Sequence, residues 1–159
     1  MINYVIGIDP GVSGGIATIG YEDVYAQSVK KFTPRDVVDH LSQFPAKESM
    51  CYLERVHSMP KQGVRSTFSF GTNYGTYIGV LTALKMPFTY VSPGVWQRIM
   101  GCLSKGDKNV TKRKAQELFP HLTITHATAD ALLIAEYGRR KEFPGVIPNK
   151  RKVSEADDI

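Results

Sequence analysis

The chain has 159 residues, of which 42% are hydrophobic and 22% charged, with a formal net charge of +5 and a pI of about 9.2. This length and balance favour one soluble globular domain with a sizeable core and exclude a chain too polar to fold. No apolar run approaches the ~18 residues of a membrane span, no signal-peptide pattern opens the chain, and the moderate basicity favours a polyanionic partner.

The N-terminal region predicts three strands joined by tight turns, at residues 2–9, 14–20 and 23–29. The first strand is almost continuously apolar, as a central buried strand would be, and it ends at Asp9. Two interpretations of the Asp9-Pro-Gly run stay open: a hairpin turn made of turn-forming residues, or a strand-end carboxylate whose burial is compensated by a divalent cation.

Helices and strands alternate in the middle of the chain. Thr33 and Pro34 predict the N-cap and first residue of a helix that ends near Phe44. The elements expected next are a strand at 49–54 ending in Glu54, a loop at 55–65, a long helix at 66–85 and a strand at 87–91.

The helix predicted over 66–85 carries three glycines at a spacing of four, which places them on one face: Gly71, Gly75 and Gly79. Each glycine costs ~1 kcal/mol relative to alanine inside a helix, so this stripe indicates that something approaches the backbone closely. The sheet of the same chain and a second subunit both fit. For a second subunit, the helix offers contact area at Phe68, Tyr74, Tyr77 and Leu81.

The last third of the chain predicts three further helices. The first holds Trp96, the second is short and basic over 110–119, and the third is capped by Thr125 and ended by Gly138. Residues 141–159 are polar and mixed in charge, so we expect a poorly ordered tail after a single domain over 1–140. The order of elements predicts an α/β fold with a five-stranded mixed sheet, three antiparallel strands followed by parallel ones, flanked by helices.

Three acids occupy positions from which they can converge. Asp9 and Glu54 end predicted strands, and Asp130 lies near the start of the last helix, with His126 one turn earlier on the same face. If the two strands are parallel neighbours, a helix across their ends brings the acids together, and their repulsion raises their pKa values. Mg²⁺ or Mn²⁺ removes that conflict, and two such ions can support phosphodiester hydrolysis.

Each of these residues also has a purely structural interpretation. Glu54 fits an exposed acid at a strand end, Asp130 an acid that stabilises a helix N-terminus, and His126 a surface or capping residue. The three acids together are more specific than any one alone, because two end buried strands and the third begins a helix after a basic stretch.

Three motifs in this order resemble the RuvC-type Holliday junction resolvases over roughly residues 3–140: Ile6-Gly-Ile-Asp-Pro-Gly-Val-Ser-Gly-Gly15, Leu53-Glu54 and Ala129-Asp-Ala-Leu-Leu-Ile-Ala135. The runs Ser58-Met-Pro-Lys-Gln-Gly63 and Phe70-Gly-Thr-Asn-Tyr-Gly75 are similar to phage-borne members. The resemblance implies an RNase H-like fold, a homodimer, and paired nicking of four-way DNA junctions in the cytoplasm of a bacterial host.

The same resemblance implies roles for individual residues. It makes Asp9, Glu54 and Asp130 catalytic ligands of Mg²⁺ or Mn²⁺, with two ions per active site. The family usually has a further acid or histidine about one turn before the last Asp. His126 takes that catalytic role here, or the role is vacant if Ala127 is the matching position.

Such a dimer needs a basic surface, because phosphate neutralisation supplies most of the affinity for DNA. The residues predicted to bind DNA are Lys61 and Arg65 on the loop just after Glu54, and Lys108, Lys112 and Arg113 before the last helix. Met59-Pro60 on the same loop is a candidate wedge between base steps.

Two competing functions are distinguishable. A non-catalytic branched-DNA-binding protein would have the same fold with an incomplete ligand set. An actin-like nucleotide-binding domain would need a second strand–turn–strand phosphate loop, which the chain lacks, so no nucleotide cofactor is expected.

Cys51 and Cys102 have no metal-like spacing and fit a reducing cytosol.

Overall fold

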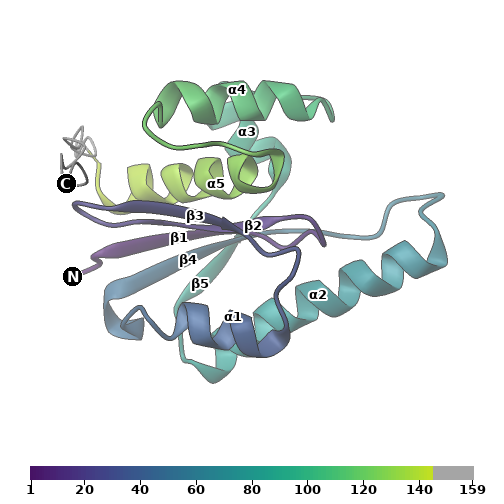
Figure 1. The fold of residues 1–159 in the computed structure, drawn as a ribbon, viewed down its shortest axis with the longest axis horizontal. Coiled ribbons are helices and arrows are strands. Elements are labelled where there is room, and N and C mark those ends of the chain that lie inside the picture. Colours follow the sequence, from purple (N-terminus) through teal and green to yellow (C-terminus); the bar gives the residue numbers. More distant parts are fainter. Residues whose placement is uncertain (145–159) are drawn as a thin grey trace, which may run out of the picture.

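The computed structural model describes residues 1–144, which form a five-stranded sheet between two layers of helices (Figure 1). The first three strands pair antiparallel, and the remaining two add in parallel. The predicted mixed sheet is therefore confirmed. Its strands, in the spatial order β3-β2-β1-β4-β5, are β1 (Tyr4–Asp9), β2 (Gly15–Ile19), β3 (Val24–Ser28), β4 (Ser49–Glu54) and β5 (Phe88–Val91).

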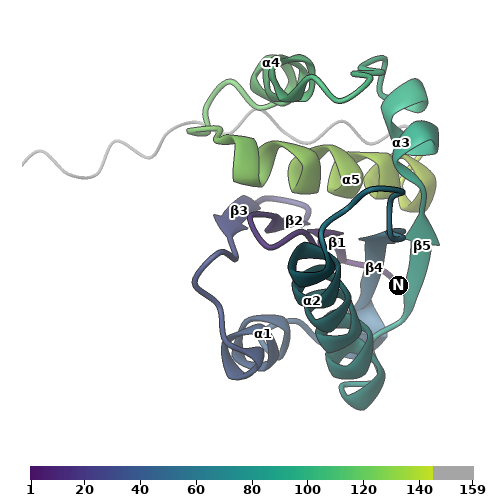
Figure 2. The ribbon, with the colours of Figure 1, turned by 90° about the vertical axis from the view of Figure 1, so that its right-hand side faces the viewer.

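Helices cover both faces of this sheet (Figures 1 and 2). On one face lie α1 (Pro34–Leu41) and α2 (Val64–Ala83), and on the other lies α5 (His126–Glu142), which packs against α3 (Pro93–Ile99) and α4 (Lys108–Leu118). A 3₁₀ turn, Ala46–Glu48, precedes β4. No helix in the described part of the chain combines the length and apolar character that crossing a membrane requires.

Strand β1 is buried on both faces, and its side chains divide between two cores. Val5 belongs to the core under α5, whereas Ile6 and Ile8 belong to the core under α1 and α2. This double burial explains why the strand is a nearly continuous apolar run. Because alternate residues of a strand share a face, Gly7 and Asp9 lie on the α5 side with Val5.

Helix α5 lies directly on the strands, with almost no side chain between. A Cβ added to Gly7 would lie 2.3 Å from the carbonyl oxygen of Ala131, and one added to Gly15 would lie 2.4 Å from that of Ala127. The stretch of α5 over residues 128–139 is buried throughout. The helix is thus enclosed between the sheet and the outer helices, and its height above the sheet is fixed by backbone contact.

Local sequence signals set the helix starts. Thr33 and Thr125 cap α1 and α5 through their side chains, which confirms both predicted starts. Helix α4 begins at Lys108, earlier than predicted, because the Asp107 carboxylate accepts a hydrogen bond from the Asn109 N–H at 2.9 Å. Because aspartate is a favoured N-cap residue, Asp107 could have indicated this helix start from the sequence.

The prediction that the last helix ends at Gly138 was wrong. Helix α5 continues to Glu142, and a Cβ on Gly138 would lie 2.4 Å from the ring of Tyr52. The glycine therefore permits close packing and does not cap the helix. The first two residues of the tail predicted over 141–159 are helical, and residues 145–159 lie outside the described part of the chain.

The glycines of α2 face away from the sheet. No neighbouring atom lies within 4 Å of a Cβ built on Gly71, Gly75 or Gly79, so the sheet is not the partner that this stripe accommodates. Tyr77 and Leu81, two of the predicted intersubunit contacts, are instead buried against the sheet. Their prediction as intersubunit contacts was wrong, because the strongly apolar side of the helix packs within its own chain.

We predict that Gly7→Ala lowers the free energy of unfolding by about 2–3 kcal/mol, because the added methyl group meets helix backbone that cannot move without lifting α5 from the sheet. Urea unfolding followed by circular dichroism measures the change. Gly94→Ala is the matched control, since its methyl group meets no neighbouring atom within 4 Å. A loss no larger in Gly7→Ala than in this control would contradict the backbone contact.

Candidate active site

The carboxyl ends of β1 and β4 lie side by side. Ile8 pairs with Leu53 in the parallel register, so Asp9 and Glu54 form the next pair along the two strands. Both acids lie on the α5 side of the sheet, because each strand also packs against α5 two residues earlier. The structure therefore brings two of the three predicted acids to one edge of the sheet.

Helix α5 carries the third acid to the same edge. Its first turns pass over β1 and β2, where the carbonyl groups of Ala127 and Ala131 touch strand glycines. Asp130, between these two residues, is 3% exposed. Its Oδ2 accepts a hydrogen bond from the Lys108 ammonium group, whereas its Oδ1 is buried without a partner in the described part of the chain.

Burial and mutual repulsion raise the pKa values of the two strand-end acids. Burial raises the pKa of Asp9 above its usual range; the Gly11 N–H, 3.1 Å from Oδ1, opposes this, and the charge of Asp130 adds to it. Burial, followed by the charge of Asp9, raises the pKa of Glu54 to about 8, although the Trp96 indole hydrogen bond lowers it. The cluster thus holds three carboxyl groups, of which Asp130 is buried and Asp9 and Glu54 are half-buried, beside a single ammonium group.

Lys108 lies within this cluster. Burial lowers the pKa of Lys108, but the contact with Asp130 and the charges of the other two acids outweigh burial, so the net shift is upward. The sequence predicted Lys108 as a DNA contact, and the structure places its ammonium group on Asp130. The residue therefore acts as the counter-ion of the acids here, and its contact with DNA stays a prediction.

The other residues predicted to bind DNA lie on the surface, in two places. Lys61 and Arg65 are exposed around the start of α2, Arg113 is exposed on α4, and its neighbour Lys112 is half-buried. No hydrogen bond or ion pair within residues 1–144 engages these four side chains. Their positive charge is available to a ligand, and the DNA contact of each stays a prediction.

His126 is the first residue of α5 and is exposed. No hydrogen bond or ion pair in the described residues joins it to the three acids. The alternative position, Ala127, presents its carbonyl oxygen to Gly15. The fourth catalytic position therefore stays a prediction.

Two side chains near the acids were not predicted from the sequence. Trp96 of α3 donates its indole N–H to Glu54 Oε2 at 2.7 Å. Asn73 of α2 donates its side-chain N–H to the Pro10 carbonyl oxygen at 2.7 Å and so holds the turn after Asp9. The partners are 42 and 63 residues apart in the chain, so no local pattern could have identified either contact.

The donor set suits a divalent cation in its chemistry. The buried Oδ1 of Asp130 accepts no hydrogen bond in the described part of the chain. The charge of Asp130 also interacts with those of Asp9 and Glu54, so the three carboxylates repel one another. Carboxylate oxygens are the ligands that Mg²⁺ and Mn²⁺ prefer. Within residues 1–144, however, no set of three or more Asp, Glu, His or Cys side chains is arranged to hold a metal ion as it stands. Lys108 supplies the compensating charge in this arrangement.

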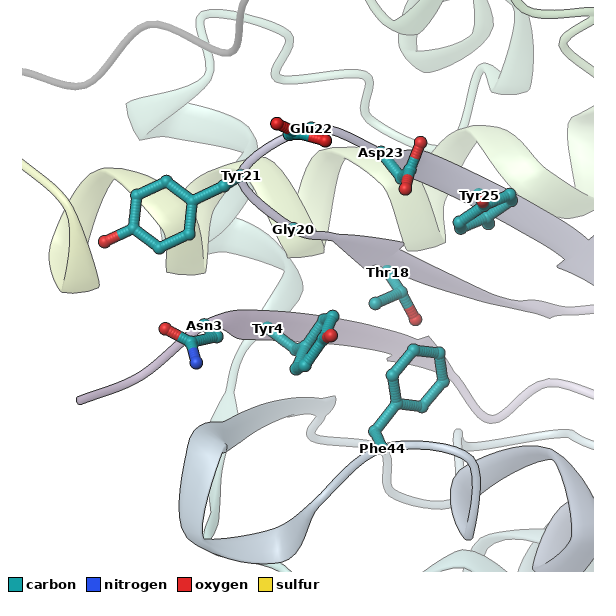
Figure 3. Close-up of a pocket in the computed structure, with 9 residues that line it drawn as sticks. All are labelled: Asn3, Tyr4, Thr18, Gly20, Tyr21, Glu22, Asp23, Tyr25 and Phe44. Carbon is teal, nitrogen blue, oxygen red and sulfur yellow. The ribbon is translucent and has the colours of Figure 1, made fainter.

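Figure 3 shows a hollow around the start of β1, and none of the three acids is among the residues that line it. It has a volume of about 480 Å³, and its lining includes Tyr4, Thr18 and Phe44. Strand β1 begins at this hollow and ends at Asp9, so the two lie at opposite ends of the strand. We place the candidate site at the acids because the hollow contains none of the predicted site residues.

The comparison with solved structures supports the fold. No model of a known protein family and no curated protein matches the chain. T. thermophilus RuvC in complex with a Holliday junction substrate has a TM-score of 0.67 at 16% identity, over 92% of this chain and 99% of that chain. A second Thermus thermophilus RuvC structure has a TM-score of 0.59 at 15% identity, over 87% and 96%. The chain therefore has a RuvC-like, RNase H-like fold.

Without metal ions, Glu54 is predicted to make the protein less stable as the pH rises from about 5 to 8. The folded state raises the pKa of Glu54 from 4.5 to about 8, so it binds this proton more tightly than the unfolded state. That stabilisation is complete below the unfolded pKa and is lost as the pH rises through the folded pKa.

Melting temperatures measured by calorimetry at about pH 5 and about pH 8, with EDTA present to remove metal ions, test this pH dependence. Glu54→Gln cannot ionise and should show a flatter dependence than the wild type. Glu117→Gln, which removes an exposed acid on α4, should keep the wild-type slope. Equal slopes in the wild type and Glu54→Gln would contradict a raised pKa of Glu54 in the folded state.

Proposed function

We propose that the chain is a structure-selective DNA endonuclease that resolves Holliday junctions by metal-dependent phosphodiester hydrolysis, with paired nicks. The observation that carries this proposal is the convergence of Asp9, Glu54 and Asp130 at one edge of a RuvC-like sheet. A solved structure similar to this chain is that of T. thermophilus RuvC in complex with a Holliday junction substrate, which supports branched DNA as the ligand.

In this proposal the three acids are the catalytic ligands of two Mg²⁺ or Mn²⁺ ions. Bound ions of this kind activate a water molecule and stabilise the leaving oxygen. The protein contributes the alignment: the Gly11 N–H holds Asp9, and α5 holds Asp130 at a fixed height above the sheet. His126 is the proposed fourth catalytic residue, because its exposed ring lies one turn before Asp130.

Branched DNA would meet two basic surfaces on either side of the acids. Lys61 and Arg65 supply one, and Lys112 and Arg113 supply the other. Met59, 60% exposed on the loop between β4 and α2, is the proposed wedge between base steps. The net charge of +5 supports such a polyanionic partner.

We also propose a homodimer built through the outward face of α2. Val64 and Phe68 are 87% and 76% exposed, and the glycine stripe leaves the helix backbone uncovered beside them. No charged residue occurs between Arg65 and Lys85, so this face carries no charge along nearly the whole helix. An uncharged, exposed face with apolar side chains is typical of a protein–protein contact.

A second function has support in one observation. The acids are paired with Lys108, and the described residues form no closed metal centre. A branched-DNA-binding protein without cleavage activity would show the same arrangement. Junction binding without cleavage in Mg²⁺ or Mn²⁺ would favour this function, and cleavage in either metal would exclude it.

The proposal extends to the biological setting. The runs Ser58–Gly63 and Phe70–Gly75, which are similar to phage-borne resolvases, support a phage-like subtype acting in the cytoplasm of a bacterial host. Neither a nucleotide cofactor nor a membrane has a part in it.

The nuclease proposal predicts Mg²⁺-dependent, paired nicking of a synthetic four-way junction, with product strands analysed on denaturing gels. Asp9→Asn should reduce the rate by at least a factor of about 100, because it removes a charged ligand of the cation. Asp39→Asn is the matched control, since it makes the same change at an exposed site on α1. Intact junctions with bound, folded wild-type protein in both metals would refute the nuclease.

The dimer proposal predicts that Gly75→Arg yields a folded monomer. The added side chain meets open space in the single chain, so circular dichroism should be unchanged, whereas it would occupy the intersubunit surface. Sedimentation velocity measures the association. Gly94→Arg, also in open space but on α3, should remain dimeric. A wild-type protein that sediments as a monomer at micromolar concentrations would exclude this interface.

A further inference from the structure

Each acid of the cluster has one carboxylate oxygen tied to the protein. The second oxygen of each acid accepts no hydrogen bond within residues 1–144. The three ties are the Gly11 N–H on Asp9 Oδ1 at 3.1 Å, the Lys108 ammonium on Asp130 Oδ2, and the Trp96 indole N–H on Glu54 Oε2 at 2.7 Å.

The donor to Glu54, the indole N–H of Trp96, makes no second hydrogen bond. Trp96 is the only tryptophan of the chain, it is 0% exposed, and its indole has a single N–H. A buried N–H left without an acceptor destabilises the fold, because it gives up its hydrogen bond to water and gains none in return. Lys108, by contrast, has a flexible and largely exposed side chain that can exchange its partner for water. Trp96 therefore constrains Glu54 more strongly than Lys108 constrains Asp130.

Donor and acceptor are held on one rigid frame. Glu54 pairs with Val91 across β4 and β5, and the chain runs from Val91 straight into α3, which carries Trp96. The indole ring is packed in the core under α5, together with Met100 and Phe119. Neither the ring nor the strand end can shift without disturbing this core, so the contact fixes the direction of the Glu54 carboxylate.

We propose that Trp96 is a positioning residue that holds Glu54 by Oε2 and leaves Oε1 to coordinate a divalent cation with Asp9 and Asp130. The inference rests on the metal dependence proposed above and names the residue that prepares the ligand. Hydrogen bonds to a ligating carboxylate orient it before the metal arrives, and losing such a partner typically lowers metal affinity by about 10–100-fold.

Calorimetric titration with Mn²⁺ at fixed pH tests the proposal on three proteins: the wild type, Trp96→Phe and Phe119→Leu. Trp96→Phe keeps an aromatic ring in the core and removes the donor. Phe119→Leu disturbs the same core without touching an acid. We expect Mn²⁺ affinity to fall by about tenfold or more in Trp96→Phe and to stay within about twofold of the wild type in Phe119→Leu.

The single tryptophan provides a second readout that needs no substitution at position 96. Mn²⁺ bound beside Glu54 should change the emission of Trp96 in the wild type. Asp9→Asn leaves the indole contact intact but removes a ligand, so it should lose this response together with the metal. An unchanged emission in a wild type that binds Mn²⁺ by calorimetry would overturn the proposal, even if Trp96→Phe does not fold.

The outcomes separate this inference from the nuclease proposal. Unchanged Mn²⁺ affinity in folded Trp96→Phe, or an equal loss in Phe119→Leu, overturns the role of Trp96 and leaves the nuclease standing. The expected affinity difference in a protein that cleaves no junction supports Trp96 and overturns the nuclease. A folded wild type that binds no Mn²⁺ overturns both.

Discussion

The candidate site depends on how closely α5 lies against the sheet. Gly7, Gly15 and Gly138 remove the side chains that would otherwise separate helix and strands, and a Cβ on any of them would lie within 2.4 Å of a neighbouring atom. Because the helix backbone touches the strands, Asp130 reaches the edge where Asp9 and Glu54 end. A helix raised by one layer of side chains would hold its carboxylate above that edge, and the three acids would not interact.

This placement costs stability. Three carboxylates share an enclosed edge with one ammonium group, and the raised pKa values of Asp9 and Glu54 express the strain between them. A core built for stability alone would place apolar side chains there. Perturbed acids gathered at one point are typical of functional sites. The site keeps an excess of negative charge, which a bound cation would compensate and a phosphate group alone would increase.

The predictable parts of this structure are those with local causes. The apolar run of β1 and the caps at Thr33 and Thr125 predicted a strand and two helix starts correctly. Gly138 was misassigned, because a glycine that caps a helix and one that faces a tyrosine ring have the same local pattern. The acids could be selected because each ends or begins an element. Their partners Lys108 and Trp96 could not, since these contacts span 22 and 42 residues and exist only once the sheet has formed.

The burial of α5 over residues 128–139 divides the site into a part that tolerates few substitutions and a part that tolerates many. Residues 128–139 are enclosed on all sides, so most substitutions there disturb a core as well as the acid that the helix carries. Glu54 instead leads into a loop whose residues 57–61 are all exposed. Mutations in this loop meet mostly solvent and cost little folding free energy. Changes in this loop can therefore alter the exposed surface beside Glu54, whereas the position of Asp130 is fixed by the packing of the helix.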